Sequence, residues 1–336
     1  MDKILTVIVP TYNMEKYLHR CLDSLIVKDQ SLFNQLEVLV INDGSKDSSS
    51  AIAHEYENRF PNVFRGIDKE NGNYGSCVNR GLKEATGKYV KILDADDSFC
   101  TKTFENYLWY LSSIDVDMVI TNYVKINEDG KVIREIKFSL PQDLKFDFSI
   151  VPDNVDIEMH SITYKLDLIR SINYHQTEGI SYTDVEWSFI PLREVKSICY
   201  YPCTVYQYLF GRVGQTVDKK IQRKNINMMM HVLENVIKDY SAHNHSLEEN
   251  YLLGKIRIVA DTVYKICLSS KSENDKLKLF DDKIKKLSPK VWNDIERNVI
   301  KPYFPYHYVK EWRNKRSFTF FFVMSLYRFL VNNISS

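Results

Sequence analysis

The first hundred residues alternate between apolar runs and segments of helical periodicity, and this alternation restricts the fold more than any other feature. Residues 5–10 and 36–43 are mostly apolar, and residues 89–93 repeat the pattern. A strand that is apolar on both faces needs cover on both faces, which is typical of parallel sheets flanked by helices. The segment 15–26 places its apolar residues at helical spacing, as such a covering helix requires. We therefore predict an α/β fold with a mostly parallel sheet flanked by helices.

Acidic residues follow two of these strands directly. Asp43 ends the second run, and Asp94, Asp96 and Asp97 follow the third. In a parallel sheet covered by helices, ligands bind at the carboxyl ends of the strands. The acids therefore lie at the edge of the sheet where we expect a ligand.

Three carboxylates within four positions need a physical reason, because each like charge makes the next group harder to ionise. One interpretation is a solvated turn in which Asp97 or Ser98 caps the following helix. A calcium loop is excluded, because its sixth position holds Phe99 where the sharp turn needs glycine. A third interpretation is a site where Mg²⁺ or Mn²⁺ holds a diphosphate, since these ions prefer oxygen ligands and relieve the repulsion. The residues alone leave the first and third interpretations open.

From residue 117 onward the pattern changes. Residues 117–138 are typical of two or three strands with a hairpin turn at Asp129. Thr183 and Glu186 have the spacing of a capping box, which predicts that a helix begins there. A strand segment at 198–210 closes this half. Beyond about residue 218 the chain is rich in Lys, Asn and Leu at helical spacing, so we predict a separate helical domain.

Charge and cysteine content exclude several classes of protein. The formal net charge of +1 provides no field that would attract nucleic acid. The six cysteines lack metal-binding spacing, so we expect free thiols in a reducing cytoplasm and no zinc site. The opening residues contain an apolar run too short for a secretory signal.

The segment 310–331 combines basic residues with a strongly apolar run. That run, 318–331, is shorter than the roughly 20 residues that span a bilayer, and it contains Arg328. We expect this segment either to make a peripheral contact at the inner face of the plasma membrane or to pack on its own domain or on another subunit of a homo-oligomer.

Four segments, in order and in spacing, resemble inverting family 2 glycosyltransferases with the GT-A fold. They are "VIVPTYNMEKYLHRCLDSL", "LEVLVINDGSKDSS", "ENGNYGSCVNRGLKEATGKYVKILDADD" and "EGISYTDVEW". The resemblance extends from about residue 4 to about residue 215 and is to bacterial enzymes that build capsular, exopolysaccharide or other surface glycans. It implies a Rossmann-like catalytic domain at 1–217 and a helical domain at 218–336 for acceptor, membrane-surface or subunit contacts.

The resemblance implies a site for the nucleotide of a UDP-sugar. Thr11 and Tyr12 would lie against the base and the ribose. Asp43 would accept a hydrogen bond from the uracil N–H, and Asp94 would contact the ribose hydroxyls. Asn71, Gly72 and Gly75 would let the backbone pass close to the donor. The implied nucleotide contacts are Pro10, Thr11, Tyr12, Asp43, Asn71, Gly75, Asp94 and Ala95.

The resemblance also implies a metal cofactor, Mn²⁺ or Mg²⁺. Asp96 would bind the ion that bridges the two phosphates, and Asp97 would be a further ligand or would hold a ligand in place. Arg212 would offset the diphosphate charge, and Gln215 would reach the donor or the acceptor. The family often has Arg where this chain has Val78, so a phosphate contact from that position is not implied.

The catalytic base of the family is the Asp of an acidic pair at the start of a helix. Asp184 matches it, with Thr183 in place of the usual Glu and Glu186 as the alternative base. A helix N-terminus favours the ionised carboxylate by about 0.3–1 kcal/mol. The implied reaction moves a hexose or N-acetylhexosamine from a UDP-sugar to a hydroxyl of a lipid- or protein-linked glycan in a metal-assisted single displacement.

Other classes fit the sequence less well. A non-catalytic module of this fold could bind nucleotide-sugars or glycans, but it would not need both Asp96 and Asp184. A nucleotidyltransferase would carry a Gly-rich basic loop after its first strand, where this chain has "PTYNMEKY". Processive synthases carry several membrane spans and a "QxxRW" motif, and this sequence has neither.

Overall fold

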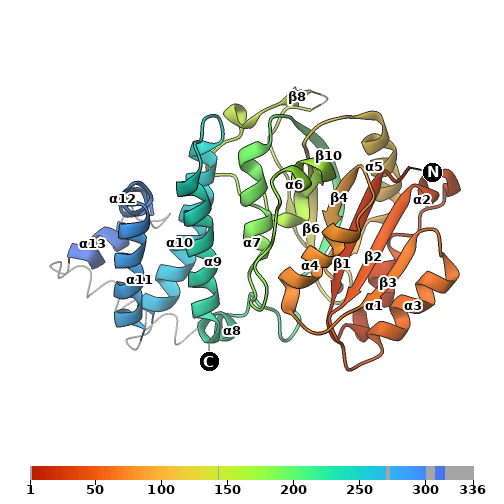
Figure 1. The fold of residues 1–336 in the computed structure, drawn as a ribbon, viewed down its shortest axis with the longest axis horizontal. Coiled ribbons are helices and arrows are strands. Elements are labelled where there is room, and N and C mark those ends of the chain that lie inside the picture. The colour runs from red at the N-terminus through yellow and green to blue at the C-terminus, as the bar shows by residue number, and fades with distance from the viewer. Residues whose placement is uncertain (1, 143, 270–272, 300–306, 315–336) are drawn as a thin grey trace. The chain divides into compact units, whose positions relative to one another are not determined.

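A computed structural model describes the chain except for residues 1, 143, 270–272, 300–306 and 315–336. The described residues form two compact units (Figure 1). Unit 1 comprises Met1–Val151 and Val155–Gln215, and unit 2 comprises Pro152–Asn154 and Thr216–Ser336.

Within the described residues of unit 1, ten strands form one mixed sheet. Its main path follows the order β3-β2-β1-β4-β9-β6-β10-β5, while β7 pairs with β6 and β8 pairs with β10. The strands are β1 (Leu5–Thr11), β2 (Leu36–Asn42), β3 (Phe64–Asp68), β4 (Tyr89–Ile92), β5 (Ser98–Phe99), β6 (Met118–Ile126), β7 (Val132–Ile136), β8 (Lys145–Phe146), β9 (Ile162–Lys165) and β10 (Ile198–Leu209).

Helices surround this sheet, together with three short 3₁₀ turns. The helices of unit 1 are α1 (Glu15–Asp23), α2 (Gln30–Asn34), α3 (Ser49–Arg59), α4 (Asn73–Glu84), α5 (Thr101–Ser113), α6 (Leu166–Ser171) and α7 (Asp184–Trp187). The 3₁₀ turns are Phe148–Ile150, Met159–Ser161 and Ile190–Glu194.

The first four strands pair parallel to one another, as the apolar runs of β1, β2 and β4 predict. Every residue of β1 and β2 is buried. On one face Ile8 packs on α4, where a Cβ at Gly81 would lie 2.5 Å from Ile8 Cγ2. On the other face Val7 and Val9 belong to the same core cluster as residues of α1 and α3. Helices thus cover both faces (Figure 1), and the predicted α/β fold is confirmed.

The strand register brings the carboxyl ends of β1 and β2 together. Thr11 is the last residue of β1 and pairs with Asn42, the last residue of β2. Tyr12 and Asp43 therefore leave neighbouring strands at the same edge. This is the edge at which a parallel sheet offers a ligand site.

The sheet is not parallel throughout. β9 lies between β4 and β6 and runs antiparallel to both. The 3₁₀ turn Met159–Ser161 leads into β9, and α6 follows β9 at once. Because β9 runs against β4, the chain enters β9 at the edge where β4 ends, which brings residues 158–161 to the ligand edge.

The predicted hairpin is also present. β6 and β7 pair antiparallel, and Gly130 in the turn has a φ of 76°, a left-handed value that suits glycine. The turn is closed by a hydrogen bond from Gly130 N to Asn127 O of 2.9 Å.

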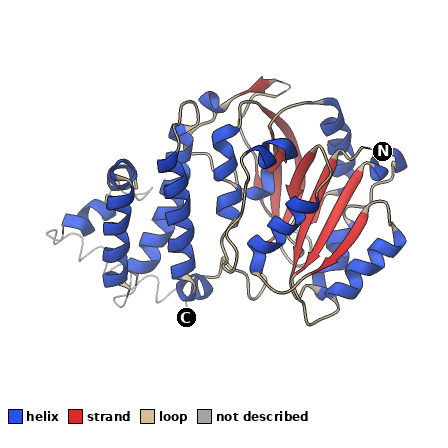
Figure 2. Cartoon of the chain, in the orientation of Figure 1, coloured by secondary structure: helices blue, strands red, loops and turns tan. Residues whose placement is uncertain are grey.

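In unit 2 the described residues contain helices and no strand (Figure 2). Met229 and Met230 are buried and belong to the core of the helices. Arg313 and Asp281 form a buried ion pair, in which each charge offsets the desolvation cost of the other. The helices are α8 (Lys219–Lys224), α9 (Ile226–Ala242), α10 (Glu249–Leu268), α11 (Asn274–Leu287), α12 (Pro289–Asn298) and α13 (Tyr308–Asn314).

Among the helices that the structure describes, none combines the length and the apolar character needed to cross a bilayer. Most of the segment 310–331, for which the sequence suggests a peripheral membrane contact, lies outside the described residues. Only its first five residues are described, as part of α13.

Candidate active site

Asp43 organises a polar corner after β2. Its Oδ1 accepts hydrogen bonds from Lys69 Nζ (2.6 Å) and Gly72 N (2.9 Å). Its backbone oxygen accepts from Asn71 Nδ2 (2.9 Å), and its backbone N–H donates to Thr11 O (2.8 Å). The corner brings together three residues of the implied nucleotide site, Thr11, Asp43 and Asn71. It adds Lys69, which sequence reasoning missed.

The remaining residues of the implied nucleotide site differ in exposure. Pro10 lies within β1 and Ala95 is buried, whereas Tyr12 is 46% exposed and offers its ring at the ligand edge. Gly75 is buried in α4 against the backbone of residue 177. A Cβ at Gly75 would lie 2.0 Å from Thr177 O, so this close approach requires glycine.

Asp97 is a buried anchor. Its Oδ2 accepts a hydrogen bond from Tyr206 OH (2.6 Å) and its Oδ1 accepts from Leu209 N (2.7 Å), so it binds β10 at two points. Burial, followed by the charge of Asp96, raises its pKa well above the usual range. Neither Asp97 nor Ser98 caps the next helix, because α5 has Cys100 at its N-cap. The interpretation of the cluster as a capped turn is therefore wrong.

Asp94 faces the first turn of α4. Its Oδ1 accepts a hydrogen bond from Tyr74 OH (2.9 Å). Burial, followed by the charge of Asp96, raises the pKa of Asp94 to about 7. A carboxyl with this pKa holds its negative charge much more readily when a cation is bound beside it.

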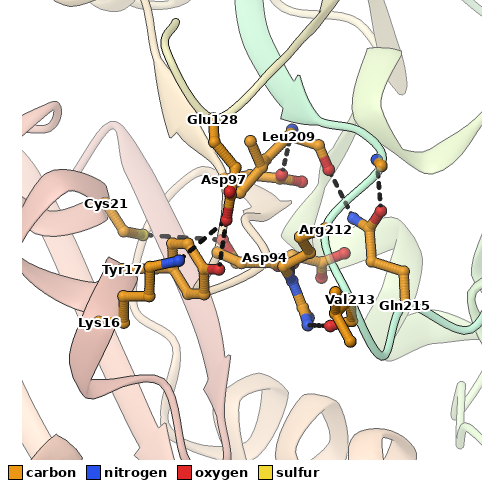
Figure 3. Close-up of polar contacts among 12 residues, drawn as sticks. Lys16, Tyr17, Cys21, Asp94, Asp97, Glu128, Leu209, Arg212, Val213 and Gln215 are labelled. Atoms are coloured by element: carbon orange, nitrogen blue, oxygen red, sulfur yellow. Dashed lines mark hydrogen bonds and ion pairs between the residues drawn. The ribbon is translucent and has the colours of Figure 1, made fainter.

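The loop after β10 lies against the acidic cluster (Figure 3). Arg212 forms an ion pair with the carboxylate of Asp96 through its Nε. Gln215 is buried and closes the loop on itself: its side-chain oxygen accepts from Gly211 N (2.8 Å) and its Nε2 donates to Leu209 O (2.5 Å). In this structure Arg212 thus neutralises an acid of the cluster, and Gln215 fixes the loop that carries Arg212.

His160 joins the cluster from the 3₁₀ turn that precedes the antiparallel strand β9. Its ring stacks on Tyr208 with centroids 4.6 Å apart, and its Nδ1 lies 3.2 Å from Glu158 Oε2. The buried Lys91 Nζ donates to His160 O (2.8 Å) and Ile162 O (3.0 Å), which fastens this segment to β4. Burial lowers the pKa of Lys91 to about 7.

Asp94, Asp97 and His160 have the chemistry and spacing of a cation site. Each offers one ligand atom, and these atoms lie within 4.8 Å of one another. Two carboxylate oxygens suit Mg²⁺ or Mn²⁺, and a cation would offset charge that is costly to bury. Asp96, the ligand implied by the resemblance, lies beside this set in sequence and pairs with Arg212.

Asp184 begins the one-turn helix α7. Tyr182, two residues earlier, has a φ of 70°, which is uncommon for a residue with a Cβ and costs free energy. The pKa of Asp184 is raised, because burial raises it by more than the charge of the nearby His160 lowers it. A carboxylate with a raised pKa is a stronger proton acceptor, as a general base must be.

The predicted capping box at the start of α7 is wrong. The side chain of Thr183 does not cap the helix but accepts a hydrogen bond from Gln176 Nε2 (2.9 Å). Glu186 turns away from Thr183 and accepts from Thr177 N (2.8 Å) and Thr177 Oγ1 (2.7 Å). Both side chains therefore hold the preceding loop instead of the helix end.

Sequence reasoning missed Lys69, Tyr74 and His160. Tyr74 had a usable signal, since it stands in the glycine-bearing loop "ENGNYG" that follows a strand. Lys69 and His160 had none. Their contacts, with Asp43 and with the acidic cluster, depend on strand order and not on local pattern.

Comparison with known proteins identifies the family. A family model described as "Glycosyl transferase family 2" matches residues 6–172, about half of the chain. The chain belongs to this family. Of its site residues, those from Pro10 to Asp97 lie within the matched region, whereas Asp184, Arg212 and Gln215 follow it.

Two curated relatives of this chain are larger bacterial proteins. Glycosyltransferase GlyA of Streptococcus pneumoniae is 34% identical over 128 residues, which are 38% of this chain and 18% of GlyA. The minor teichoic acid biosynthesis protein GgaB of Bacillus subtilis is 32% identical over 175 residues, 51% of this chain and 19% of GgaB. The aligned region thus spans about a fifth of each relative.

Solved structures share the fold of this chain at low identity. S. aureus TarS has a TM-score of 0.65 at 18% identity, over 87% of this chain and 50% of TarS. Residues 1–349 of S. aureus TarS, in complex with UDP-GlcNAc, have a TM-score of 0.54 at 16% identity, over 94% of this chain and 93% of that one. The mannosyltransferase PcManGT of Pyrobaculum calidifontis, in complex with GDP-Man and Mn²⁺, has a TM-score of 0.53 at 15% identity, over 88% of this chain and 84% of that one.

Proposed function

We propose that this glycosyltransferase moves a hexose or N-acetylhexosamine from a UDP-sugar to a hydroxyl of a glycan acceptor, with inversion at the anomeric carbon. One observation carries the proposal. Asp94, Asp97 and His160 could together hold a cation at the edge where the parallel strands end, and the charges of His160 and Asp184 act on Asp94. The candidate metal site and the candidate base Asp184 are thus close enough for the charge of Asp184 to affect Asp94.

The nucleotide would bind at the corner organised by Asp43. Its carboxylate would accept the uracil N–H, and Tyr12 would cover the base with its exposed ring. The ammonium group of Lys69 already contacts Asp43, so it could donate a hydrogen bond to a carbonyl of the uracil ring. The complex of TarS with UDP-GlcNAc supports a uridine nucleotide.

The metal would be Mn²⁺ or Mg²⁺, held by carboxylates of the cluster with His160. Such an ion supplies Lewis-acid stabilisation of the charge that develops on the leaving diphosphate. Asp96 and Arg212 form a pair beside the site, so either one can meet the diphosphate or its ion once the pair opens. The Mn²⁺ complex of PcManGT supports use of a divalent ion.

Asp184 would take the proton of the acceptor hydroxyl as that oxygen attacks the anomeric carbon. The bond from the anomeric carbon to the UDP oxygen breaks as the new glycosidic bond forms, so an α-linked donor gives a β-linked product. Glu186 is less suited to this role, because both of its oxygens already accept hydrogen bonds from Thr177.

The acceptor would be a growing bacterial surface glycan, lipid- or protein-linked. The name of GgaB, a minor teichoic acid biosynthesis protein, supports a glycan acceptor. A cytoplasmic location, the peripheral membrane contact of 310–331 and a homo-oligomer remain predictions from the sequence, as does the role of residues 218–336.

Donor hydrolysis tests the proposal without knowledge of the acceptor. The full chain is incubated with UDP-Glc, UDP-Gal, UDP-GlcNAc, UDP-GalNAc or GDP-Man, each with Mn²⁺, with Mg²⁺ or with EDTA, and nucleotide release is measured. We expect release from at least one UDP-sugar, dependent on the metal. Metal-dependent UDP binding without release from any donor would favour a non-catalytic binding module, and equal release in EDTA would exclude the metal role.

A further inference from the structure

We propose that Asn79 and Gln176 are positioning residues. They fix the loop that carries the catalytic base Asp184 against helix α4. We call residues 175–187 the base segment. The inference rests on the proposed function, because it assigns these two residues a task only if Asp184 is the base.

Asn79 binds the backbone of the base segment as a neighbouring strand would. Its Oδ1 accepts from Gln176 N (2.8 Å), and its Nδ2 donates to Gln176 O (2.8 Å). The same Nδ2 lies 2.8 Å from Glu178 Oε1 and 3.3 Å from His175 Nε2. One amide side chain thus satisfies both backbone groups of a residue that has no strand partner, and it sets the distance between α4 and the segment.

Gln176 transmits this constraint to the residue before the base. Its side chain is fully buried, and its Nε2 donates to Thr183 Oγ1 (2.9 Å) while its Oε1 accepts from Tyr174 OH (3.2 Å). Thr183 is fully buried as well and directly precedes Asp184. Three hydrogen bonds therefore connect α4 with the peptide that carries the base.

Further contacts hold the segment in place. Glu186 accepts hydrogen bonds from Thr177 N and Thr177 Oγ1, and Gly179 N donates to Gly72 O (3.0 Å). Thr177 O lies so close to the backbone of Gly75 that no side chain fits between them. The segment is thus pinned to α4 at Gly72, Gly75 and Asn79, which are spaced over two turns of that helix.

The helix that receives these bonds also serves the donor side. Tyr74 on α4 donates to Asp94 in the cation site, and Gly72 at its N-cap donates to Asp43. The left-handed backbone of Tyr182 costs free energy and persists only where the surroundings fix it. Through these contacts α4 holds both the residues of the donor site and the segment that carries Asp184. This matters because reacting groups must be held closely in line for the reaction to occur.

The test uses Asn79→Ala, with Lys83→Ala as the matched control, since Lys83 is an exposed residue of the same helix. The readouts are kcat for hydrolysis of UDP-GlcNAc with Mn²⁺, or of the UDP-sugar that the donor panel selects, and the Kd of UDP with Mn²⁺. We expect Asn79→Ala to lower kcat about ten- to hundredfold while the Kd of UDP changes less than about threefold. Lys83→Ala should match the wild type in both.

A double-mutant cycle tests the second link. Gln176→Leu and Thr183→Val each remove one side of the same hydrogen bond, so their effects on kcat should be strongly non-additive. Gln176→Glu, which can still accept from Thr183 OH, should recover part of the loss. Additive effects, or equal losses in Gln176→Leu and Gln176→Glu, would contradict the proposed transmission.

Hydrogen exchange provides a readout that does not depend on turnover. In Asn79→Ala the amides of Gln176 and Gly179 should exchange faster, while those of β1 and β2 keep their protection. Unchanged exchange at Gln176 would overturn the inference. A global loss of protection would overturn it too, since it would show a general structural role for Asn79.

Asp184→Asn separates failure of the inference from failure of the proposed function. If Asp184→Asn keeps near-normal turnover, the base assignment is wrong and the inference falls with it. If Asp184→Asn is inactive while Asn79→Ala and Gln176→Leu keep wild-type kcat, the base assignment stands and only the inference is wrong.

Discussion

The two halves of the candidate site are built in different ways. On the donor side, Tyr12, Asp43 and Asp94 each follow within two residues of a parallel strand, so the sheet register alone sets their spacing. On the base side, Asp184 follows a stretch of twelve residues after α6 that forms neither helix nor strand. That stretch is held by side-chain hydrogen bonds to α4 instead.

The difference indicates which changes each half tolerates. We expect Tyr12, Asp43 or Asp94 to be replaceable without moving its neighbours, because backbone pairing keeps β1, β2 and β4 in register. On the base side a lost hydrogen bond lets several residues shift together, since no ladder remains to hold them. We therefore expect donor-side variants to act mainly on nucleotide binding and base-side variants mainly on turnover.

The largest expected effect is that of Asp184→Asn. Loss of a general base typically lowers the rate about 10²- to 10⁴-fold, while UDP binding with Mn²⁺ should persist. Asp167→Asn is the control, because Asp167 is likewise in the first turn of a short helix but is exposed. Near-normal hydrolysis in Asp184→Asn would show that Asp184 is not the base, and the distinction between the two halves of the site would fail.

Asp97→Ala should destabilise the donor side strongly. It leaves Tyr206 OH and Leu209 N buried without their carboxylate, at a cost of about 1–3 kcal/mol for each orphaned donor. Urea unfolding of the variant measures this loss. A change below about 0.5 kcal/mol would show that water or another group replaces the carboxylate.

Gly75→Ala should disturb the contact between the two halves. The new Cβ would meet Thr177 O at 2.0 Å, so the base segment must move, and such overpacking costs about 1–3 kcal/mol. We expect lower kcat with smaller effects on UDP binding. Gly130→Asn is the control, because Gly130 has open space around it and Asn tolerates its positive φ. Wild-type hydrolysis in Gly75→Ala would show that α4 and the segment can separate without consequence.

The smallest expected effect concerns pH and the support of the Asp43 corner. His54 lies 2.9 Å from Asp68 and 2.7 Å from Glu57, and Asp68 also accepts from Asn42, the neighbour of Asp43. Hydrogen bonds to Asp68 and then Glu57 raise the pKa of His54, and the bond to His54 lowers the pKa of Asp68.

The raised pKa of His54 stabilises the fold below the unfolded value of about 6.5, and this contribution is lost as the pH rises through the folded pKa. The lowered pKa of Asp68 stabilises the fold above about pH 3.9, and that contribution is lost as the pH falls through its folded pKa. His54→Gln should therefore destabilise most between about pH 4 and 6.5, by less than about 1 kcal/mol because both side chains are well exposed. Urea unfolding near pH 5.5 and near pH 9 checks this, and an equal loss at both values would contradict it.

Much of the donor side could be predicted from the sequence. Apolar runs gave the buried parallel strands, and the position of Asp43 and Asp94 directly after them placed both at the ligand edge. The resemblance added the expected role of each residue. What the sequence did not show is how Asp97 is used: it anchors β10 through Tyr206 and Leu209, which lie more than a hundred residues away.

The base side was less accessible to sequence reasoning. The spacing of Thr183 and Glu186 matched a capping box, yet tertiary partners at Gln176 and Thr177 took both side chains. A local motif indicates which hydrogen bonds a segment can form within itself. It does not indicate whether a buried residue elsewhere in the fold forms a more favourable hydrogen bond with the same side chain.

By itself, the sequence determined the elements whose formation depends on near neighbours in the chain: the apolar strands, the covering helices, the glycine turn and the acids that end the strands. Hydrophobic burial acts with a period of two or of 3.6 residues, so it is visible in any short window. Only the tertiary structure decided that β9 runs antiparallel and brings His160 to Asp94, and that Asn79 holds Gln176. Such contacts join residues far apart in sequence, and strand order, which no local period encodes, determines which of them meet.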